Sequence, residues 1–233
     1  VFSTETKNSG IIRTDSAETR RKDGAPRTRK ETDFMYQSWE ELEKNCLCCE
    51  KCQLREGRTQ VVFGVGNRHA RVLFIGEGPG EQEDLQGKPF VGRSGQYLDK
   101  QLAAVGLSRD KDVYIANIVK CRPPQNRDPL PEEQDACITW LRAQTAFLRP
   151  KIIVCLGRIA AMKIIRPDFK ITKEHGVFFE KGGVLMMATL HPAALLRNPA
   201  SKPGAFEDYL RLREKMEQLG LVAPETFPDA PCP

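Results

Sequence analysis

The chain contains no run of eighteen apolar residues, so its sequence offers no candidate for a membrane-spanning helix. The first thirty residues are polar and charged, and they lack the apolar centre of a secretory signal. We therefore expect a soluble, intracellular protein without a membrane partner. With 233 residues and 40% hydrophobic content, the chain is long enough for one domain with a well-buried core.

The chain also lacks a strong charge of one sign, since 36 basic residues face 31 acidic ones. A net charge of +5 permits a polyanionic partner without identifying one. Residues 1–35 show no hydrophobic periodicity and contain two short basic runs, at 20–22 and 27–30. We predict a disordered basic tail there, either without function or as a non-specific tether to DNA. Residues 220–233 are proline-rich and predicted to be a flexible tail.

Cysteine, in contrast, is present at eight positions. In an intracellular chain of this length, such a number favours metal ligation over disulfide bonds. Cys49 and Cys52 have the two-residue spacing of a metal-binding pair, whereas Cys121 and Cys137 are far apart in the sequence. Cys155 lies in an apolar run and is predicted to be a core residue.

Short apolar segments alternate with amphipathic ones along the rest of the chain. Strands are predicted at 72–77, 113–120, 151–157 and 184–191, and helices at 34–44, 94–105, 131–148 and 205–219. Ser94 is the expected N-cap of the second helix, and Pro131 suits the first turn of the third. This alternation predicts an α/β fold, a three-layer α/β/α sandwich around a central, mainly parallel sheet of four strands, with ligand loops at the carboxyl ends of the strands.

A glycine-rich loop follows the first predicted strand, with the sequence Gly-Glu-Gly-Pro-Gly-Glu-Gln-Glu-Asp at 76–84. It lacks the lysine and Ser/Thr of a Walker loop, and its spacing differs from that of dinucleotide-binding folds. By itself it is also compatible with a phosphate loop or a simple tight turn. Two further segments, Lys-Pro-Phe-Val-Gly-Arg-Ser-Gly-Gln at 88–96 and Leu-His-Pro-Ala-Ala-Leu-Leu-Arg at 190–197, add to it. Taken together, the three resemble the uracil-DNA glycosylase superfamily, in particular its iron-sulfur branch, the type-4 enzymes.

The resemblance implies a 4Fe-4S cluster held by Cys49, Cys52, Cys121 and Cys137. Four thiolates also suit zinc, but zinc sites usually combine two close-spaced pairs, and the second pair here is distant. Cys46 and Cys48 lie beside the first pair and are alternatives to Cys49, which is favoured because its spacing matches the family. We expect the cluster to be a structural clasp.

The resemblance also assigns the groups that would hold an extruded base. Phe90 would stack on uracil, and Asn117 would bind the base edge, since an amide offers both a donor and an acceptor. His191 would donate a hydrogen bond to the departing base as negative charge develops on it. Without the neighbouring motifs, Phe90 would be interpreted as a core residue, and His191 as a histidine without a catalytic role whose hydrogen bonds are made within the protein.

Backbone contacts to the base are assigned to Glu77 and Gly78. Gly78 stands where several branches of the superfamily have Asp or Asn, so the group that holds the attacking water is left between Glu77 and Glu83. Glu83 is named as catalytic, with exclusion of the 5-methyl group of thymine as its alternative role. Leu195 is predicted to fill the space of the flipped base, and Arg197 to contact DNA phosphates.

The sequence therefore predicts a monomeric DNA-repair enzyme, with its glycosylase domain at 36–219. The enzyme would hydrolyse the N-glycosidic bond of deoxyuridine in single- and double-stranded DNA, releasing uracil and leaving an abasic site. The resemblance further implies a cytoplasmic, nucleoid-associated protein of bacteria or archaea. The alternative is a non-catalytic or covalently capturing, metal-stabilised module that binds DNA damage.

Overall fold

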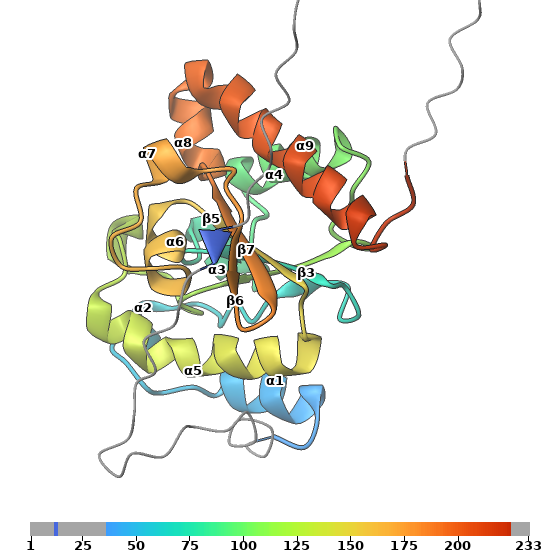
Figure 1. Cartoon of the computed structure of the whole chain (residues 1–233). Coiled ribbons are helices and arrows are strands. Elements are labelled where there is room, and N and C mark those ends of the chain that lie inside the picture. Colours follow the sequence, from blue (N-terminus) through green and yellow to red (C-terminus); the bar gives the residue numbers. More distant parts are fainter. Residues whose placement is uncertain (1–11, 14–35, 225–233) are drawn as a thin grey trace, which may run out of the picture.

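The computed structural model describes residues 12–13 and 36–224. A single sheet runs through the middle of this part of the chain, with the strand order β1-β6-β7-β5-β3-β4-β2 (Figure 1). The strands are β1 (Ile12–Arg13), β2 (Val65–Gly66), β3 (Val72–Gly76), β4 (Val113–Asn117), β5 (Ile152–Leu156), β6 (Phe179–Lys181) and β7 (Val184–Thr189). The four inner strands β7, β5, β3 and β4 are parallel to one another, as predicted.

The α/β fold class is confirmed, but the prediction of only four strands was too low. β2 and β6 pair antiparallel with β4 and β7, and β1 pairs parallel with β6. These three strands have only two or three residues each, too few to show a periodic pattern in the sequence. β1 also falls within the predicted disordered tail; the rest of 1–35 lies outside the described residues, as does 225–233.

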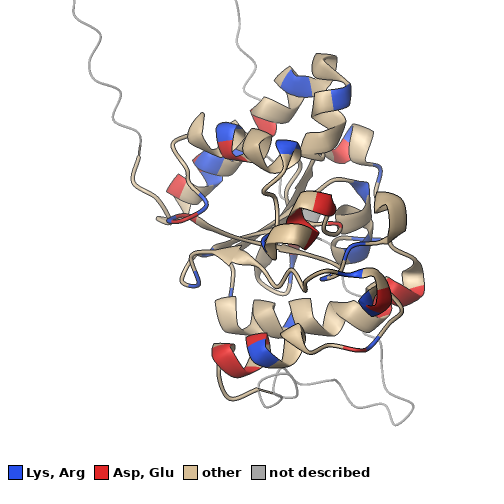
Figure 2. Cartoon of the chain, turned by 180° about the vertical axis from the view of Figure 1, so that it is seen from behind, with Lys and Arg blue, Asp and Glu red and all other residues tan. Residues whose placement is uncertain are grey.

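Helices cover both faces of the sheet (Figure 1). Their bounds are α1 (Trp39–Leu47), α2 (Leu54–Gly57), α3 (Glu81–Gln86), α4 (Arg93–Ala103), α5 (Pro131–Leu148), α6 (Arg158–Ile164), α7 (Ile171–Glu174), α8 (Pro192–Arg197) and α9 (Lys202–Gln218). None of these helices has both the length and the apolarity that crossing a bilayer requires. On the side shown in Figure 2, Lys and Arg are interspersed with Asp and Glu. The net positive charge is therefore not gathered into one broad basic face in that view.

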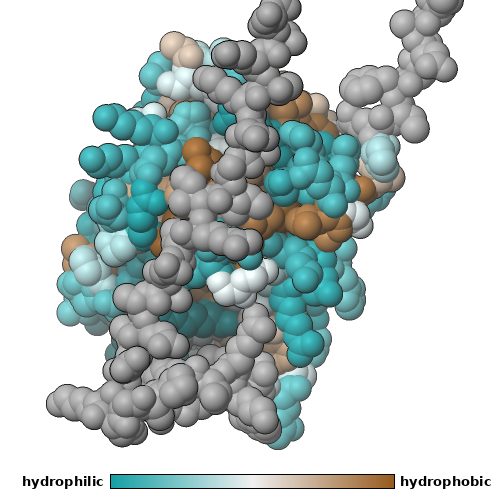
Figure 3. Space-filling model, viewed as in Figure 1, coloured by the Kyte–Doolittle hydropathy of each residue, from teal (hydrophilic) through white to brown (hydrophobic). Residues whose placement is uncertain are grey.

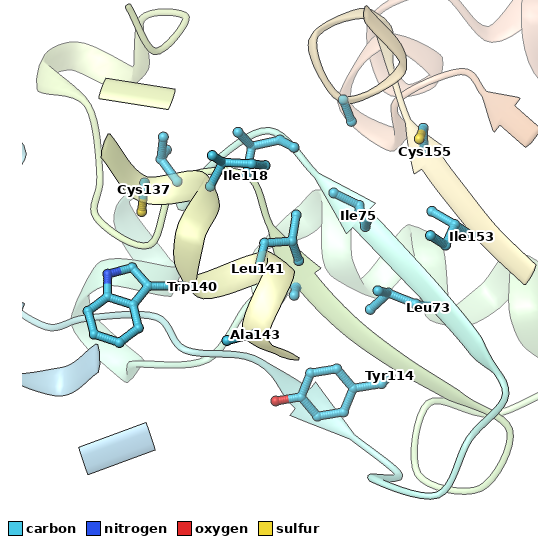
Figure 4. Close-up of a cluster of buried hydrophobic side chains, with 14 of the residues drawn as sticks. Leu73, Ile75, Tyr114, Ile118, Cys137, Trp140, Leu141, Ala143, Ile153 and Cys155 are labelled. Atoms are coloured by element: carbon cyan, nitrogen blue, oxygen red, sulfur yellow. The ribbon is translucent and has the colours of Figure 1, made fainter. Parts of the chain in front are cut away.

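Alternate side chains of β3 point to opposite faces of the sheet, and so they belong to two separate clusters of the core. Leu73 and Ile75 belong to a cluster with residues of α1, α5 and α6, whereas Val72 and Phe74 pack with residues of α4 and α9. Figure 4 shows the first cluster, in which Leu141 of α5 points toward Ile75 and Ile153 of the sheet. The sheet is thus buried on both sides, which explains the nearly continuous apolar runs of its inner strands.

Local signals fix the helix ends to different degrees. α5 begins at Pro131 and ends at Leu148, as predicted, because proline suits the first helical position. Ser94 is not the N-cap of α4: the helix already begins at Arg93, and Gly92 is its cap. In α1 the Ser38 hydroxyl accepts a hydrogen bond from the Glu41 amide at 3.1 Å, which fixes the start of the helix that leads to the cysteines.

Candidate active site

The predicted site residues converge at the carboxyl edge of the parallel strands. Gly76 ends β3 and pairs with Asn117 at the end of β4. Gly157 follows β5, and its amide donates to the carbonyl of Thr189 at the end of β7, two residues before His191. Parallel strands bring their carboxyl ends to one edge, so segments far apart in the sequence meet there.

Asn117 and Phe90 meet above Gly76. A methyl group at Gly76 would lie 2.4 Å from Asn117 Oδ1 and 2.7 Å from the Phe90 ring, so only glycine fits beneath the two side chains. Asn117 is buried, and its Oδ1 has no hydrogen-bond partner among the described residues. A buried polar atom without a partner is costly, and its presence indicates a ligand that donates to it.

His191 completes this group of side chains. Its ring lies 5.7 Å from the Phe90 ring, centroid to centroid, with an angle of 35° between the planes. His191 Nδ1 accepts a hydrogen bond from the amide of Ala193 at 3.1 Å, which leaves the proton of a neutral imidazole on Nε2. Burial, aided by the charge of Arg197 and opposed by Glu83, lowers the pKa of His191 to about 4. The imidazole is therefore neutral at physiological pH and can act as a donor through Nε2.

The backbone of Phe90 is held in a conformation that a phenylalanine rarely adopts, with a φ of 54°. Arg109 donates to the Phe90 carbonyl at 2.7 Å and to the Pro89 carbonyl at 3.2 Å. Gly95 of α4 packs directly on the Phe90 carbonyl, where a methyl group would lie 1.9 Å from the oxygen. Strained backbone persists only where its surroundings fix it, and such residues cluster at functional sites. No sequence pattern singled out Arg109, because it acts through the backbone of another segment, whereas Gly95 lies within the 88–96 segment without an assigned role.

The two candidate carboxylates differ in how they are engaged. Glu83 accepts from the amides of Gly80, Val91 and Gly92 at 3.1, 2.9 and 2.8 Å, so it ties the glycine-rich loop to the segment after Phe90. In the part of the chain that the structure describes, no backbone amide donates to the Glu77 carboxylate. Burial, followed by the nearby Asp128 carboxylate, raises the pKa of Glu77 to about 7, while Arg158 acts in the opposite direction.

Asp128 and Arg158 form an ion pair beside Glu77, with 2.7 Å between Arg158 Nη2 and Asp128 Oδ2. Asp128 belongs to the loop that follows Cys121, and Arg158 opens α6 immediately after Gly157. Sequence reasoning assigned no role to this pair. Position alone could have indicated Arg158, because it follows the end of an inner strand.

The prediction for Leu195 needs correction. α8 starts at Pro192, and this helical phase turns Leu195 inward, where it is fully buried, so it does not lie at the surface where a flipped base would leave space. Leu196 is half-buried and Arg197 is exposed.

Gly78, in the glycine-rich loop, lies against Val119, where a methyl group would approach Val119 Cγ2 to 2.7 Å.

The four predicted cysteine ligands line one small cavity together with Arg58 and Lys120. Cys46 and Cys48 are not among its lining residues: Cys46 is buried in α1, and Cys48 is exposed. Among the described residues, no group of three or more His, Cys, Asp or Glu is arranged to hold a single metal ion. Thiolates on one zinc ion lie within about 4 Å of each other, because each Zn–S bond is ~2.3 Å long. The cysteine side chains are therefore gathered but not closed around a single ion.

Three sulfur atoms of this group accept hydrogen bonds. Trp140 Nε1 lies 3.2 Å from Cys49 Sγ, the Lys120 amide 3.2 Å from Cys137 Sγ, and Arg58 Nη1 3.5 Å from Cys121 Sγ. Such donors suit thiolates that carry charge in a bound cluster. Burial raises the pKa of Cys137 to about 12, so a metal that binds there must displace the thiol proton.

The chain is similar in sequence to several known proteins. The family model for the uracil DNA glycosylase superfamily matches residues 63–212. A type-4 uracil-DNA glycosylase of Archaeoglobus fulgidus is 42% identical over 186 residues, which cover 76% of this chain and 93% of that protein. The type-4 uracil-DNA glycosylase of Thermotoga maritima is 47% identical over 156 residues, covering 66% and 81%. A type-5 uracil-DNA glycosylase of Thermus thermophilus is 33% identical over 150 residues, covering 56% and 68%.

Proposed function

The chain belongs to the uracil-DNA glycosylase superfamily as a DNA-repair glycosylase that removes uracil, and we propose that it acts as a type-4 enzyme through the side chains gathered at Gly76. It hydrolyses the N-glycosidic bond of deoxyuridine in single- or double-stranded DNA and leaves an abasic site. The observation that carries this mechanism is the meeting of Phe90, Asn117 and His191 at one strand edge. Because all three side chains come from one chain, we propose that the enzyme is a monomer. We also propose that its substrate is the DNA of the nucleoid.

Recognition of the base rests on Phe90 and Asn117. An extruded pyrimidine stacks on the Phe90 ring, and its edge meets the Asn117 amide. The unpartnered Asn117 Oδ1 requires a donor, and the uracil N3–H supplies one. Cytosine has no hydrogen on N3 and carries an amino group at position 4, so the same amide orientation leaves it unpaired. A site built to pair with one hydrogen-bonding edge rejects the base that lacks it.

Departure of the base is assisted by His191. Its Nε2–H donates to uracil O2, where negative charge develops as the glycosidic bond breaks. The low pKa keeps the ring neutral, and the bond from the Ala193 amide fixes the tautomer that can donate. The donor is therefore set before the substrate binds.

The attacking water is assigned to Glu77. Three backbone amides engage the Glu83 carboxylate, which makes Glu83 a support for the loop that carries Phe90. The raised pKa of Glu77 gives it a proton affinity suited to a general base near neutral pH. In its charged form the same carboxylate stabilises the positive charge that develops on the sugar as the glycosidic bond breaks. Arg197, exposed beside the site, is proposed to contact a DNA phosphate.

The four cysteines that share one cavity fit a 4Fe-4S cluster, and the three N–H donors to their sulfur atoms would stabilise the thiolates that hold it. When bound, the cluster supplies a cross-link rather than a reacting group. Cys49 and Cys52 then tie the segment after α1 to Cys121 and to Cys137 of α5. Iron and zinc analysis of anaerobically purified protein tests this assignment: about four irons per chain support it, and stoichiometric zinc contradicts it.

The function is tested by incubating the protein with an oligonucleotide that contains one uracil and then cleaving abasic sites with alkali. Strand scission at uracil only, lost in His191→Ala, supports the proposal. A heat-stable protein–DNA adduct indicates covalent capture instead. A gel shift without scission or adduct indicates a module that only binds damage.

A further inference from the structure

A second concave site lies away from the proposed active site. It is a cavity of about 850 Å³ between α5, α6 and the turn that joins β6 to β7. Figure 3 shows a recessed hydrophilic area in the lower half of the molecule, near the position of α5 in Figure 1. Arg71 and Lys151, which line the cavity, precede β3 and β5 and so lie at the amino edge of the sheet. The cavity and the proposed active site therefore open at opposite edges.

The lining of this cavity is cationic, with no acidic side chain. The basic lining residues are Arg71, Arg142, Arg149, Lys151, Lys163 and Lys181. Lys163 forms an ion pair with Asp135, but Arg142, Arg149, Lys151 and Lys181 have no ion pair with any described residue. Like charges gathered in a concave site raise the local potential and attract an anion.

Apolar side chains lie beside these charges. The apolar lining residues are Ile75, Ile138, Leu141, Ala146, Pro150, Ile153, Ile164 and Val184. Figure 4 shows Leu141 of α5 facing Ile75 of β3 and Ile153 of β5. On α5 the lining residues recur with helical spacing, from Ile138 to Arg149. At 1.5 Å per residue this stripe is roughly 16 Å long, enough for about five residues of extended peptide.

We propose that this cavity binds a short acidic peptide segment with apolar side chains, supplied by a partner protein. The carboxylates meet the four cations that have no ion pair with a described residue, and the apolar side chains contact Ile164 and Val184, which are half-buried. A nucleic-acid backbone fits less well, because it would place charged phosphates against the half-buried side chains of Ile164 and Val184. Residues 14–35 of the chain, with six basic and five acidic side chains, lack the net negative charge that would complement the site.

This inference goes beyond the proposed function: it gives the enzyme a docking site that stays accessible while DNA occupies the opposite edge. It is tested by fluorescence anisotropy with a labelled hexapeptide that alternates Asp with Leu or Phe. We expect binding that weakens roughly tenfold in the double variant Arg142→Glu/Lys181→Glu. Both side chains are exposed, so the variant should fold and keep its uracil-release activity. The matched control is Lys111→Glu, an exposed lysine that does not line the cavity.

Four results would overturn the proposal. The first is no binding of the hexapeptide at millimolar concentration. The second is equal binding by the wild type and the double variant. The third is equal binding of a peptide in which Ser replaces Leu and Phe, since the cavity would then attract any anion. Displacement of the hexapeptide by an oligothymidine, with the displacement abolished in the double variant, would instead identify a nucleic-acid site. Because uracil release is measured separately, failure here is distinguishable from failure of the proposed function.

Discussion

Replacing Gly95 with alanine should impair catalysis through the backbone of Phe90. A Cβ at this position would lie 1.9 Å from the Phe90 carbonyl oxygen, whereas real Cβ contacts are essentially never below 3.0 Å. The Phe90 backbone must therefore move by about 1 Å. A misplacement of this size in a positioning group costs on the order of 100-fold in rate. We thus expect kcat/KM for uracil release to fall ~100-fold in Gly95→Ala.

The assay is single-turnover uracil release from a single-stranded oligonucleotide, combined with thermal unfolding of the same samples. Gly57→Ala is the matched control, because no heavy atom lies within 4 Å of a Cβ at that position. A Gly95→Ala variant that folds but releases uracil slowly, beside a fully active Gly57→Ala control, therefore isolates the effect on Phe90. Wild-type activity in folded Gly95→Ala would refute the reasoning. If that variant does not fold, Arg109→Lys, which weakens the contact with the Phe90 carbonyl, gives the same test with a smaller perturbation.

Three further predictions follow from the site. Since Glu77 must be charged and its pKa is about 7, the rate should fall about tenfold per pH unit below that value; Asp128→Asn should shift the fall to lower pH in a pH–rate profile, and an unmoved profile would contradict the assignment. His191→Ala should lower kcat by roughly 100- to 1,000-fold with little change in DNA affinity, measured by gel shift; a loss in affinity alone would make His191 a binding group. Cys121→Ser should lose iron and visible absorbance and unfold at a lower temperature, and full iron content by metal analysis would remove Cys121 from the ligand set.

Much of the fold could be predicted from the sequence because its inner strands are buried on both faces. Such strands appear in the sequence as short apolar runs. The 18-residue helix α5 has a clear start signal at Pro131 and a clear stop signal at Pro150. The short outer strands β2 and β6 depend on pairing partners from elsewhere in the chain, and two or three residues carry no periodic signal. Tertiary pairing, not local propensity, decides these elements.

The site was predictable where a motif residue follows a strand, as with Asn117 and His191. Leu195 was misjudged because its exposure depends on the phase of α8, which becomes fixed only once the helix is known to start at Pro192. Arg109 went unnoticed for a different reason. It supports Phe90 through its carbonyl group, and a contact between a side chain and a distant backbone leaves no pattern in the sequence.

One physical cause places the two proposed catalytic groups in complementary protonation states. Burial disfavours whichever form of a group is charged, so it lowers the pKa of His191 to about 4 and raises that of Glu77 to about 7. Between pH values of about 4 and about 7, both groups are mainly in their neutral forms. Above about 7, Glu77 is charged and His191 is still neutral. The donor to the leaving base and the carboxylate that orients the water are then both in their working states. The pocket that excludes water around the flipped base therefore also favours catalysis at neutral to mildly alkaline pH.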